Sequence, residues 1–214
     1  YGLLLNVAGV EMRQPSDKHP MTLIREGLPR FRVALGIPAE SSHRYLWEEP
    51  ESASAASGLP VPATHTLYQQ LHNYPVGNSG QERAVMTKGC KYNIQPIRRA
   101  FLSPLRACIA VQGASDFEEQ LRGGLRGEAR REYGLLFLGD NNFLVDRLEE
   151  IPEFPQAHWF IRLLQDAGGM PNHVTRLTTR IDRADMSRTE SALYAPVGSS
   201  SCEIPSEAWT EVGY

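Results

Sequence analysis

The chain has 214 residues, 41% of them hydrophobic and 22% charged, and a formal net charge of −3. This composition is typical of a globular protein with one well-buried core, or at most two small domains. Cys90, Cys108 and Cys202 are scattered without a Cys-x-x-Cys pair, which supports neither a disulfide framework nor a zinc site and favours a reducing cytoplasm. No run approaches the ~18 apolar residues of a membrane-spanning helix, so we expect no membrane partner.

The N-terminal residues predict a helix followed by a strand. The opening run YGLLLNVAGVEM places four apolar residues on one helical face, namely Leu3, Leu4, Val7 and Ala8. It begins without a methionine, and we expect a first strand to be encoded upstream. In residues 29–37, apolar side chains alternate with Arg30 and Arg32, as in a half-buried strand. The small, almost uncharged segment 50–63 predicts a mobile loop.

Residues 69–106 concentrate positive charge. The segment contains six basic residues and one acidic residue, Glu82, so it carries +5 in a chain of −3. The basic residues are Arg83, Lys88, Lys91, Arg98, Arg99 and Arg106. Turn-forming residues at 73–80 and 88–91 predict a protruding β-hairpin or a pair of hairpins.

Such an arm can bind nucleic acid, because Lys and Arg can contact phosphates and aromatic rings can stack on splayed bases. Tyr74, Tyr92 and Phe101 offer such rings, although packing at the root of the arm is the simpler interpretation for Phe101. A basic run is also often only a solvated surface, and charge alone leaves that interpretation open.

The segments after the arm continue the mixture of strands and helices. The apolar run Leu105–Val111 predicts a central buried strand. Ser115 and Glu118 form a possible capping box for a helix with Phe117, Leu121 and Leu125 on one face. Glycines at 123, 124 and 127 should end or loosen that helix.

Four further elements are predicted towards the C-terminus. Residues 133–138 and 143–148 flank a Gly-Asp-Asn-Asn turn and predict a hairpin. Residues 156–167 read as an amphipathic helix with Trp159, Phe160, Leu163 and Leu164 buried, and His158 beside them as a packing or surface residue. Residues 177–182 alternate as a strand, and the tail from Ala195 is expected to be irregular.

The order of these elements favours an α+β fold. With the upstream strand added, the order strand, helix, strand, insertion, strand, helix, strand matches a ferredoxin-like sandwich. We therefore predict a single domain over residues 1–214, with an inserted arm at about 69–97 and a C-terminal extension at about 152–214.

Signatures of catalysis are weak. Residues 77–80 do not complete a G-x-S-x-G elbow, and residues 77–91 lack the Walker order of a phosphate loop. Asp182 and Asp185 are more simply neutralised by neighbouring arginines than by a divalent ion. We predict no metal, no cofactor and no catalytic residue.

One group of residues keeps an enzymatic alternative open. His65, Tyr68, His72 and Tyr74, with Lys88 and Lys91, can supply a general base, a general acid and a charge stabiliser. These groups suffice for metal-free RNA cleavage through a 2′-hydroxyl. His72, Tyr68 and Lys88 are the candidate catalytic residues in that alternative.

Three long motifs carry a resemblance to a known family. They are LYQQLHNYPVGNSGQERAVMTKGCKYNIQPIRRAFL at 67–102, YGLLFLGDNNFLVDRLEEI at 133–151 and IDRADMSRTES at 181–191. Together, and in this order, they resemble the CRISPR-associated Cas family-five proteins, specifically the Myxan or type I-B branch. The opening YGLLLNVAG is similar to the helix that follows the first strand in that family.

The resemblance implies a RAMP-type protein with an RRM-like ferredoxin core that holds the 5′ handle of a CRISPR RNA in the Cascade surveillance complex. Its implied partners are this RNA, the Cascade backbone subunits and large subunit, and target DNA met through the complex. Such complexes act in antiviral defence or guided transposition. The arm would be the thumb, which lies against the guide and a backbone subunit.

The resemblance also assigns candidate RNA-binding residues. Arg83, Lys88, Lys91 and Tyr92 map to the thumb, and Arg98 and Arg99 to its root; Tyr74 and His72 complete the set. The chain departs from the family where Ala100 replaces an expected acidic residue and where the first strand is absent. Type I-C relatives cleave CRISPR RNA themselves, whereas type I-B systems resemble those with a separate processing nuclease. We therefore expect a non-catalytic prokaryotic subunit, with a processing endoribonuclease as the alternative.

Overall fold

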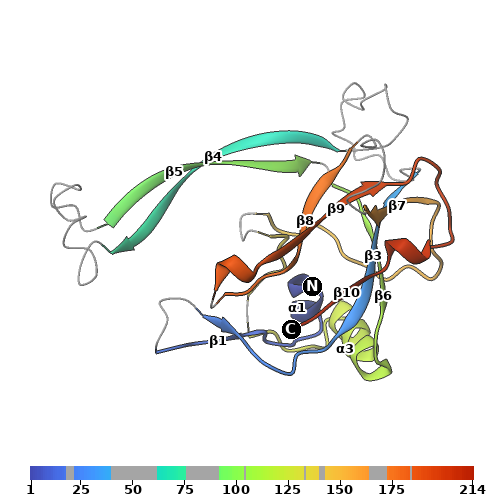
Figure 1. Ribbon diagram of the computed structural model, residues 1–214. Helices are drawn as coiled ribbons and strands as arrows, with labels where there is room; N and C mark the ends of the chain where they lie inside the picture. The colour runs from blue at the N-terminus through green and yellow to red at the C-terminus, as the bar shows by residue number, and fades with distance from the viewer. Residues whose placement is uncertain are drawn as a thin grey trace. The chain divides into compact units, whose positions relative to one another are not determined.

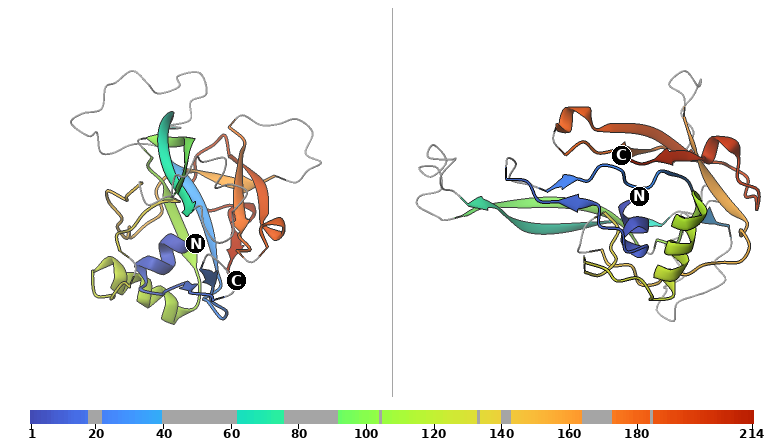
Figure 2. Two further views of the ribbon diagram at one scale, coloured as in Figure 1. Left: turned by 90° about the vertical axis from the view of Figure 1, so that its left-hand side faces the viewer. Right: turned by 90° about the horizontal axis from the view of Figure 1, so that it is seen from below.

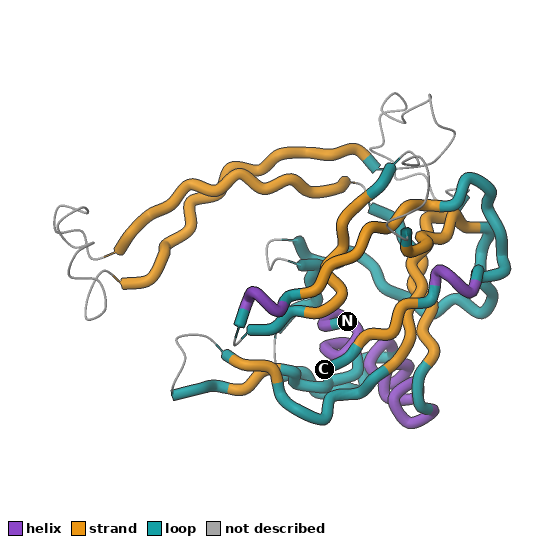
Figure 3. Tube along the Cα trace, in the orientation of Figure 1, coloured by secondary structure: helices purple, strands orange, loops and turns teal. Residues whose placement is uncertain are grey.

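The computed structural model describes residues 1–17, 22–39, 62–75, 92–103, 105–132, 134–139, 143–163, 173–183 and 185–214. The chain divides into two compact units, one formed by residues 1–44 and 107–214 and the other by residues 45–106. Strands predominate over helices in the described segments (Figures 1 and 3), and the strand pairings there are antiparallel. The fold is therefore α+β.

Two helices, two 3-10 turns and eight strands are described in the larger unit. The helical elements are α1 (Gly2–Val7), α3 (Ser115–Leu125), η1 (Met186–Arg188) and η2 (Ser206–Ala208). The strands are β1 (Arg13–Gln14), β2 (Leu23–Ile24), β3 (Phe31–Pro38), β6 (Cys108–Gln112), β7 (Ala157–Arg162), β8 (Thr175–Arg180), β9 (Glu190–Pro196) and β10 (Thr210–Val212). None of the helices in the described ranges has the length and apolar character needed to cross a bilayer.

One antiparallel sheet organises this unit. Its strands follow the order β10, β3, β7, β9, β8, and β6 also pairs with β3. Residues 32–36 of β3 pair with β6, whereas residues 31–33 pair with β10 and residues 36–38 with β7. The strand predicted at 29–37 is confirmed, but its second half is buried on both faces because Ala34, Gly36 and Ile37 are all covered.

The first apolar cluster joins α1 and α3 to the sheet. Leu4 and Leu5 of α1 pack with Phe31 of β3 and Phe117 of α3, whose rings stack at a centroid distance of 4.6 Å. The two helices lie side by side (Figure 2). The Tyr1 hydroxyl donates a hydrogen bond of 2.9 Å to the Pro29 carbonyl, and burial, followed by the nearby Tyr214, raises the pKa of Tyr1 to about 12.

The second cluster surrounds Trp159 of β7, which is fully buried. Its Nε1 donates a hydrogen bond of 2.9 Å to the Ser201 carbonyl oxygen. Its indole ring lies against Gly36, where a Cβ atom would come within 2.8 Å of Cε3. His158 is also buried, and its Nδ1 donates to the Val197 carbonyl at 3.0 Å, which confirms it as a packing residue.

The helix predicted at 156–167 is wrong, because residues 157–162 form strand β7. The pattern was misleading because Ala157, His158 and Trp159 are all buried, so the strand shows no alternation. Both edges of β7 are paired, one with β3 and the other with β9. A short run that is buried on both faces does not distinguish a strand from a buried helix segment.

The tail is more ordered than the sequence predicts. Pairing of β9 continues through Ala195 and Pro196, and β10 adds residues 210–212 to β3.

The prediction of a central buried strand at Leu105–Val111 is also wrong. The strand there, β6, pairs within the described residues only with β3, and Ala110 is its one buried residue.

The helix predicted after β6 is confirmed as α3, but its ends differ from the prediction. Its N-cap is Ala114 without a side-chain cap, and the Glu118 carboxylate accepts a hydrogen bond of 3.0 Å from the Gly113 amide. Ser115 and Glu118 therefore form no capping box. The helix continues through Gly123 and Gly124 to Leu125.

The remaining predicted elements have mixed outcomes. The opening helix and the strand at 177–182 are confirmed as α1 and β8. The hairpin predicted at 133–148 is reduced to a bridge between Phe137 and Leu144, with the Leu138 amide donating to the Phe143 carbonyl at 2.9 Å. The loop predicted at 50–63 lies outside the described residues except for Pro62 and Ala63.

Candidate nucleic-acid interface

A long β-hairpin forms the described part of the smaller unit. Strand β4 (Ala63–Pro75) pairs antiparallel with β5 (Tyr92–Ser103), and we call this pair the ribbon (Figures 1 and 3). The pairing runs without a shift from Ala63 opposite Ser103 to His72 opposite Ile94, and a bulge separates it from the last pair, Pro75 and Tyr92. A hairpin is therefore confirmed in this segment, whereas most of the turn residues predicted at 73–80 and 88–91 lie outside the described residues.

The register assigns each side chain to one of two faces, because successive residues of a strand point to opposite sides. Thr64, Thr66 and Tyr68 share the first face with their partners Leu102, Ala100 and Arg98. His65 and Leu67 share the second face with their partners Phe101 and Arg99, and Gln69 lies on the same face. Arg98 and Arg99 are adjacent in sequence but point in opposite directions.

The first face is open to solvent. Tyr68 is 75% exposed and Leu102 is 47% exposed, and Arg98 opposite Tyr68 is exposed as well. The next pair along the ribbon, Thr66 and Ala100, has short and exposed side chains. An aromatic ring and a guanidinium group therefore lie on the same uncovered face.

The second face is more covered. The rings of His65 and Phe101 contact each other, with centroids 5.7 Å apart and planes inclined by 31°. Arg99, Phe101 and Gln69 are half-buried, and Leu67 is 37% exposed. The packing interpretation of Phe101 agrees with this ring contact.

Neither strand of the ribbon contains an aspartate or a glutamate. The two strands therefore supply no carboxylate beside Arg98. At the C-terminal end of α3, Arg122 contacts Glu150 and the C-cap residue Arg126 contacts Glu128, each at 2.9 Å. These contacts raise the pKa of both guanidinium groups.

The other predicted RNA-binding residues are only partly covered by the structure. Arg83, Lys88 and Lys91 lie outside the described residues. The backbones of His72 and Tyr74 belong to β4 and that of Tyr92 to β5, at the end of the ribbon that contains the bulge. Of the candidate catalytic residues His72, Tyr68 and Lys88, only Tyr68 has a described side chain.

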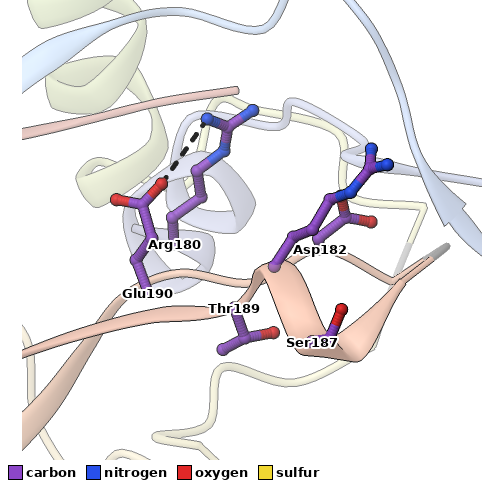
Figure 4. A pocket seen from close by; sticks show the side chains of 6 residues that line it. Arg180, Asp182, Ser187, Thr189 and Glu190 are labelled. Atoms are coloured by element: carbon purple, nitrogen blue, oxygen red, sulfur yellow. Dashed lines mark ion pairs between the residues drawn. The ribbon is translucent and has the colours of Figure 1, made fainter.

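A polar pocket of about 540 Å³ lies in the larger unit (Figure 4). Its lining consists of Arg180, Asp182, Ser187, Arg188, Thr189 and Glu190. Arg180 and Glu190 point the same way and lie 3.8 Å apart between Nη1 and Oε1. No group of three or more potential metal ligands occurs in the part of the chain that the structure describes.

Asp185, beside this pocket, is held by its own loop. Its Oδ1 accepts hydrogen bonds from the Ser187 hydroxyl at 2.6 Å and the Ser187 amide at 3.1 Å, and Arg188 Nε lies 3.3 Å from Oδ2. These contacts, the Ser187 hydroxyl first, lower the pKa of the Asp185 carboxyl group. The arginine contact agrees with the neutralisation inferred from the sequence.

The sequence missed the pairing of Tyr68 with Arg98. The sequence indicates Tyr68 only as a catalytic candidate and places Arg98 beside Arg99 in one basic group. The alternation within β4 and β5 is readable from the sequence, but the register depends on where the intervening turn lies.

Comparison with models of known protein families and with curated proteins finds no match for this chain.

Proposed function

We propose that this chain is a non-catalytic RNA-binding subunit of a type I CRISPR Cascade complex and holds the 5′ handle of the CRISPR RNA. The observation that carries the proposal is the ribbon, which presents two arginines and an exposed tyrosine without any carboxylate in its strands. Residues 69–75 and 92–103 of the ribbon belong to the segment that carries +5, and residues 67–75 and 92–102 belong to the motif that resembles the Cas family-five proteins.

The chemistry of single-stranded RNA fits such a ribbon. Phosphate contacts by Arg and Lys supply affinity that does not depend on sequence, and stacked or hydrogen-bonded bases supply specificity. Handle RNA that lies along the ribbon would place phosphates near guanidinium groups and bases near the Tyr68 ring. Target DNA and the other Cascade subunits would be met through the assembled complex.

The order of elements in the larger unit supports a ferredoxin-like RAMP core as part of the proposal. The chain passes from α1 to β3, then through the ribbon segment to β6 and α3. β3 and β6 pair antiparallel, and both helices contribute to one apolar cluster. A ferredoxin-like core has the same helix, strand, strand, helix succession after its first strand.

Binding is favoured over cleavage by the spacing of the candidate catalytic residues. Tyr68 and His72 lie four residues apart on β4, which corresponds to about 13 Å along an extended strand. A general acid and a general base must each lie within about 3 Å of the proton that they transfer. Two groups separated in this way do not form a ready pair around one phosphodiester.

The proposal is tested by the salt dependence of RNA binding. We expect the double variant Arg98→Ala, Arg99→Ala to bind handle RNA more weakly and to show a slope of log K against log salt that is flatter by up to about 1.4, because fewer counterions are released. Fluorescence anisotropy with labelled RNA at several salt concentrations measures both quantities.

The matched control is Arg122→Ala, Arg126→Ala at the C-terminal end of α3, which removes the same charge from arginines that contact carboxylates. We expect this control to bind as the unchanged protein does. Equal affinity and slope in the ribbon variant and the unchanged protein would contradict the proposal. Cleavage of repeat RNA in EDTA that is abolished by His72→Ala would instead support the processing ribonuclease.

A further inference from the structure

We propose that Tyr68 and Arg98 together bind one unpaired nucleotide on the first face of the ribbon, with the tyrosine ring stacked on the base and the guanidinium group paired with its phosphate. This inference rests on the proposed function and assigns RNA contact to one face and one pair of residues. It also gives Tyr68 a role in binding instead of proton transfer.

The register brings the two side chains together. Tyr68 and Arg98 are direct partners across the antiparallel pair, in a stretch without a bulge. The Cβ atoms of direct partners lie about 4.5–5.5 Å apart and project to the same side. A ring and a guanidinium group at this spacing can contact the base and the phosphate of the same nucleotide.

The surroundings of Tyr68 leave its ring available. The side chain is 75% exposed, although burial of an aromatic ring is favourable. The adjoining pair on this face whose side chains the structure describes, Thr66 and Ala100, is too short to cover a tyrosine ring. Space of this kind beside an exposed aromatic residue accommodates a planar base.

Charge favours a nucleotide over an apolar partner. The strands contain no acidic residue, so no carboxylate within them competes with a phosphate for Arg98. Among the side chains that the structure describes on the opposite face, none are arranged equivalently, because the His65 and Phe101 rings contact each other and Arg99 is half-buried. The ligand is single-stranded, since bases within a duplex are stacked on each other and present no free ring face.

The test measures binding of single-stranded repeat RNA to the full chain and to four variants. Tyr68→Ala should weaken binding about 10-fold without changing the salt slope, because it removes stacking and no charge. Tyr68→Phe should bind as the unchanged protein does, since it keeps the ring. Arg98→Ala should weaken binding and flatten the slope by about 0.7. Thr66→Ala, on the same face, should have no effect.

A scan of abasic nucleotides along the RNA identifies the stacked base. We expect one position at which removal of the base weakens binding to the unchanged protein but has no further effect on Tyr68→Ala. RNA and DNA strands of the same sequence are compared in parallel. Equal binding of the RNA strand and the DNA strand supports a stacking site that does not recognise the 2′-hydroxyl group. Equal binding of duplex and single-stranded RNA overturns the inference.

The outcomes separate this inference from the proposed function. If the unchanged protein does not bind single-stranded RNA, both fail. If the Arg98 and Arg99 double variant loses binding while Tyr68→Ala retains it, the proposed function stands and the stacking site is wrong. If Tyr68→Phe loses binding as Tyr68→Ala does, the hydroxyl group and not the ring is required, and the stacking site is again wrong. Thermal unfolding of each variant confirms that the fold is unchanged.

Discussion

Gly124 shows how one absent side chain sets the contact between α1 and α3. Glycine inside a helix costs about 1 kcal/mol relative to alanine, yet α3 continues through this residue. A Cβ atom on Gly124 would overlap the carbonyl oxygen of Val7. The glycine therefore permits the close approach of the two helices that brings Leu5 and Phe117 into one apolar cluster.

We predict that Gly124→Ala lowers the free energy of unfolding by about 2 kcal/mol or more, as expected for overpacking of a tight contact. The obstacle is backbone, so α1 must move to relieve it. Urea unfolding followed by circular dichroism measures the change.

Gly123→Ala in the same helix is the control. Its Cβ would lie 3.3 Å from the Glu128 Oε2 atom, at the end of a flexible side chain. We expect this variant to be unchanged or stabilised by up to about 1 kcal/mol, from helix propensity. Similar destabilisation by both substitutions would contradict the role given to the helix contact.

At the scale of elements, the ribbon has little packing of its own. Every side chain within residues 63–69 and 98–103 is exposed or half-buried. A two-stranded hairpin with no fully buried side chain among those described is at best marginally stable in water. A partner that covers one face would therefore add a large share of the stability of this element.

We predict that amide hydrogens of β4 and β5 exchange faster than those of β3 and β7 in the free protein, because weakly packed elements open with a lower free energy. Addition of handle RNA should slow exchange in β4 and β5, since a ligand stabilises the state that it binds. Hydrogen exchange read by mass spectrometry measures both. Unchanged exchange in these strands at saturating RNA would show that the RNA binds elsewhere.

The comparison of β4 and β5 with β7 shows which elements could be predicted. Turn residues and flanking strand formers identified the hairpin. The strand β7 was mistaken for a helix because the residues that cover its two faces are distant in sequence, and the pattern of Ala157, His158 and Trp159 contains no alternation. Non-local contacts of this kind determine that residues 157–162 form a strand, and local propensity does not reveal them.

The same limit applied to the candidate site. The positive charge of Arg98 and Arg99 is visible in the sequence, but their cross-strand partners, Tyr68 for Arg98 and Leu67 for Arg99, follow only from the register. Register over a connection of this length is set by the turn and the partners of the hairpin. The close approach at Gly124 was equally hidden, because Val7 lies in another helix.

At the scale of the whole chain, charge is separated between segments. Residues 69–106 carry +5, so the rest of the −3 chain carries −8. Concentrated positive charge attracts polyanions, while negative charge elsewhere disfavours their unspecific binding. This separation fits a subunit that holds RNA with one part of its chain and meets proteins with others.

The most direct test of the proposed function is purification of the protein from its host through an affinity tag, with identification of the associated RNA and proteins. We predict that Cascade backbone subunits, a large subunit and a CRISPR RNA with its 5′ handle are recovered with the protein. The Arg98→Ala, Arg99→Ala variant should recover less of this RNA than the Arg122→Ala, Arg126→Ala control. Recovery of the protein without RNA and without these subunits would contradict the account.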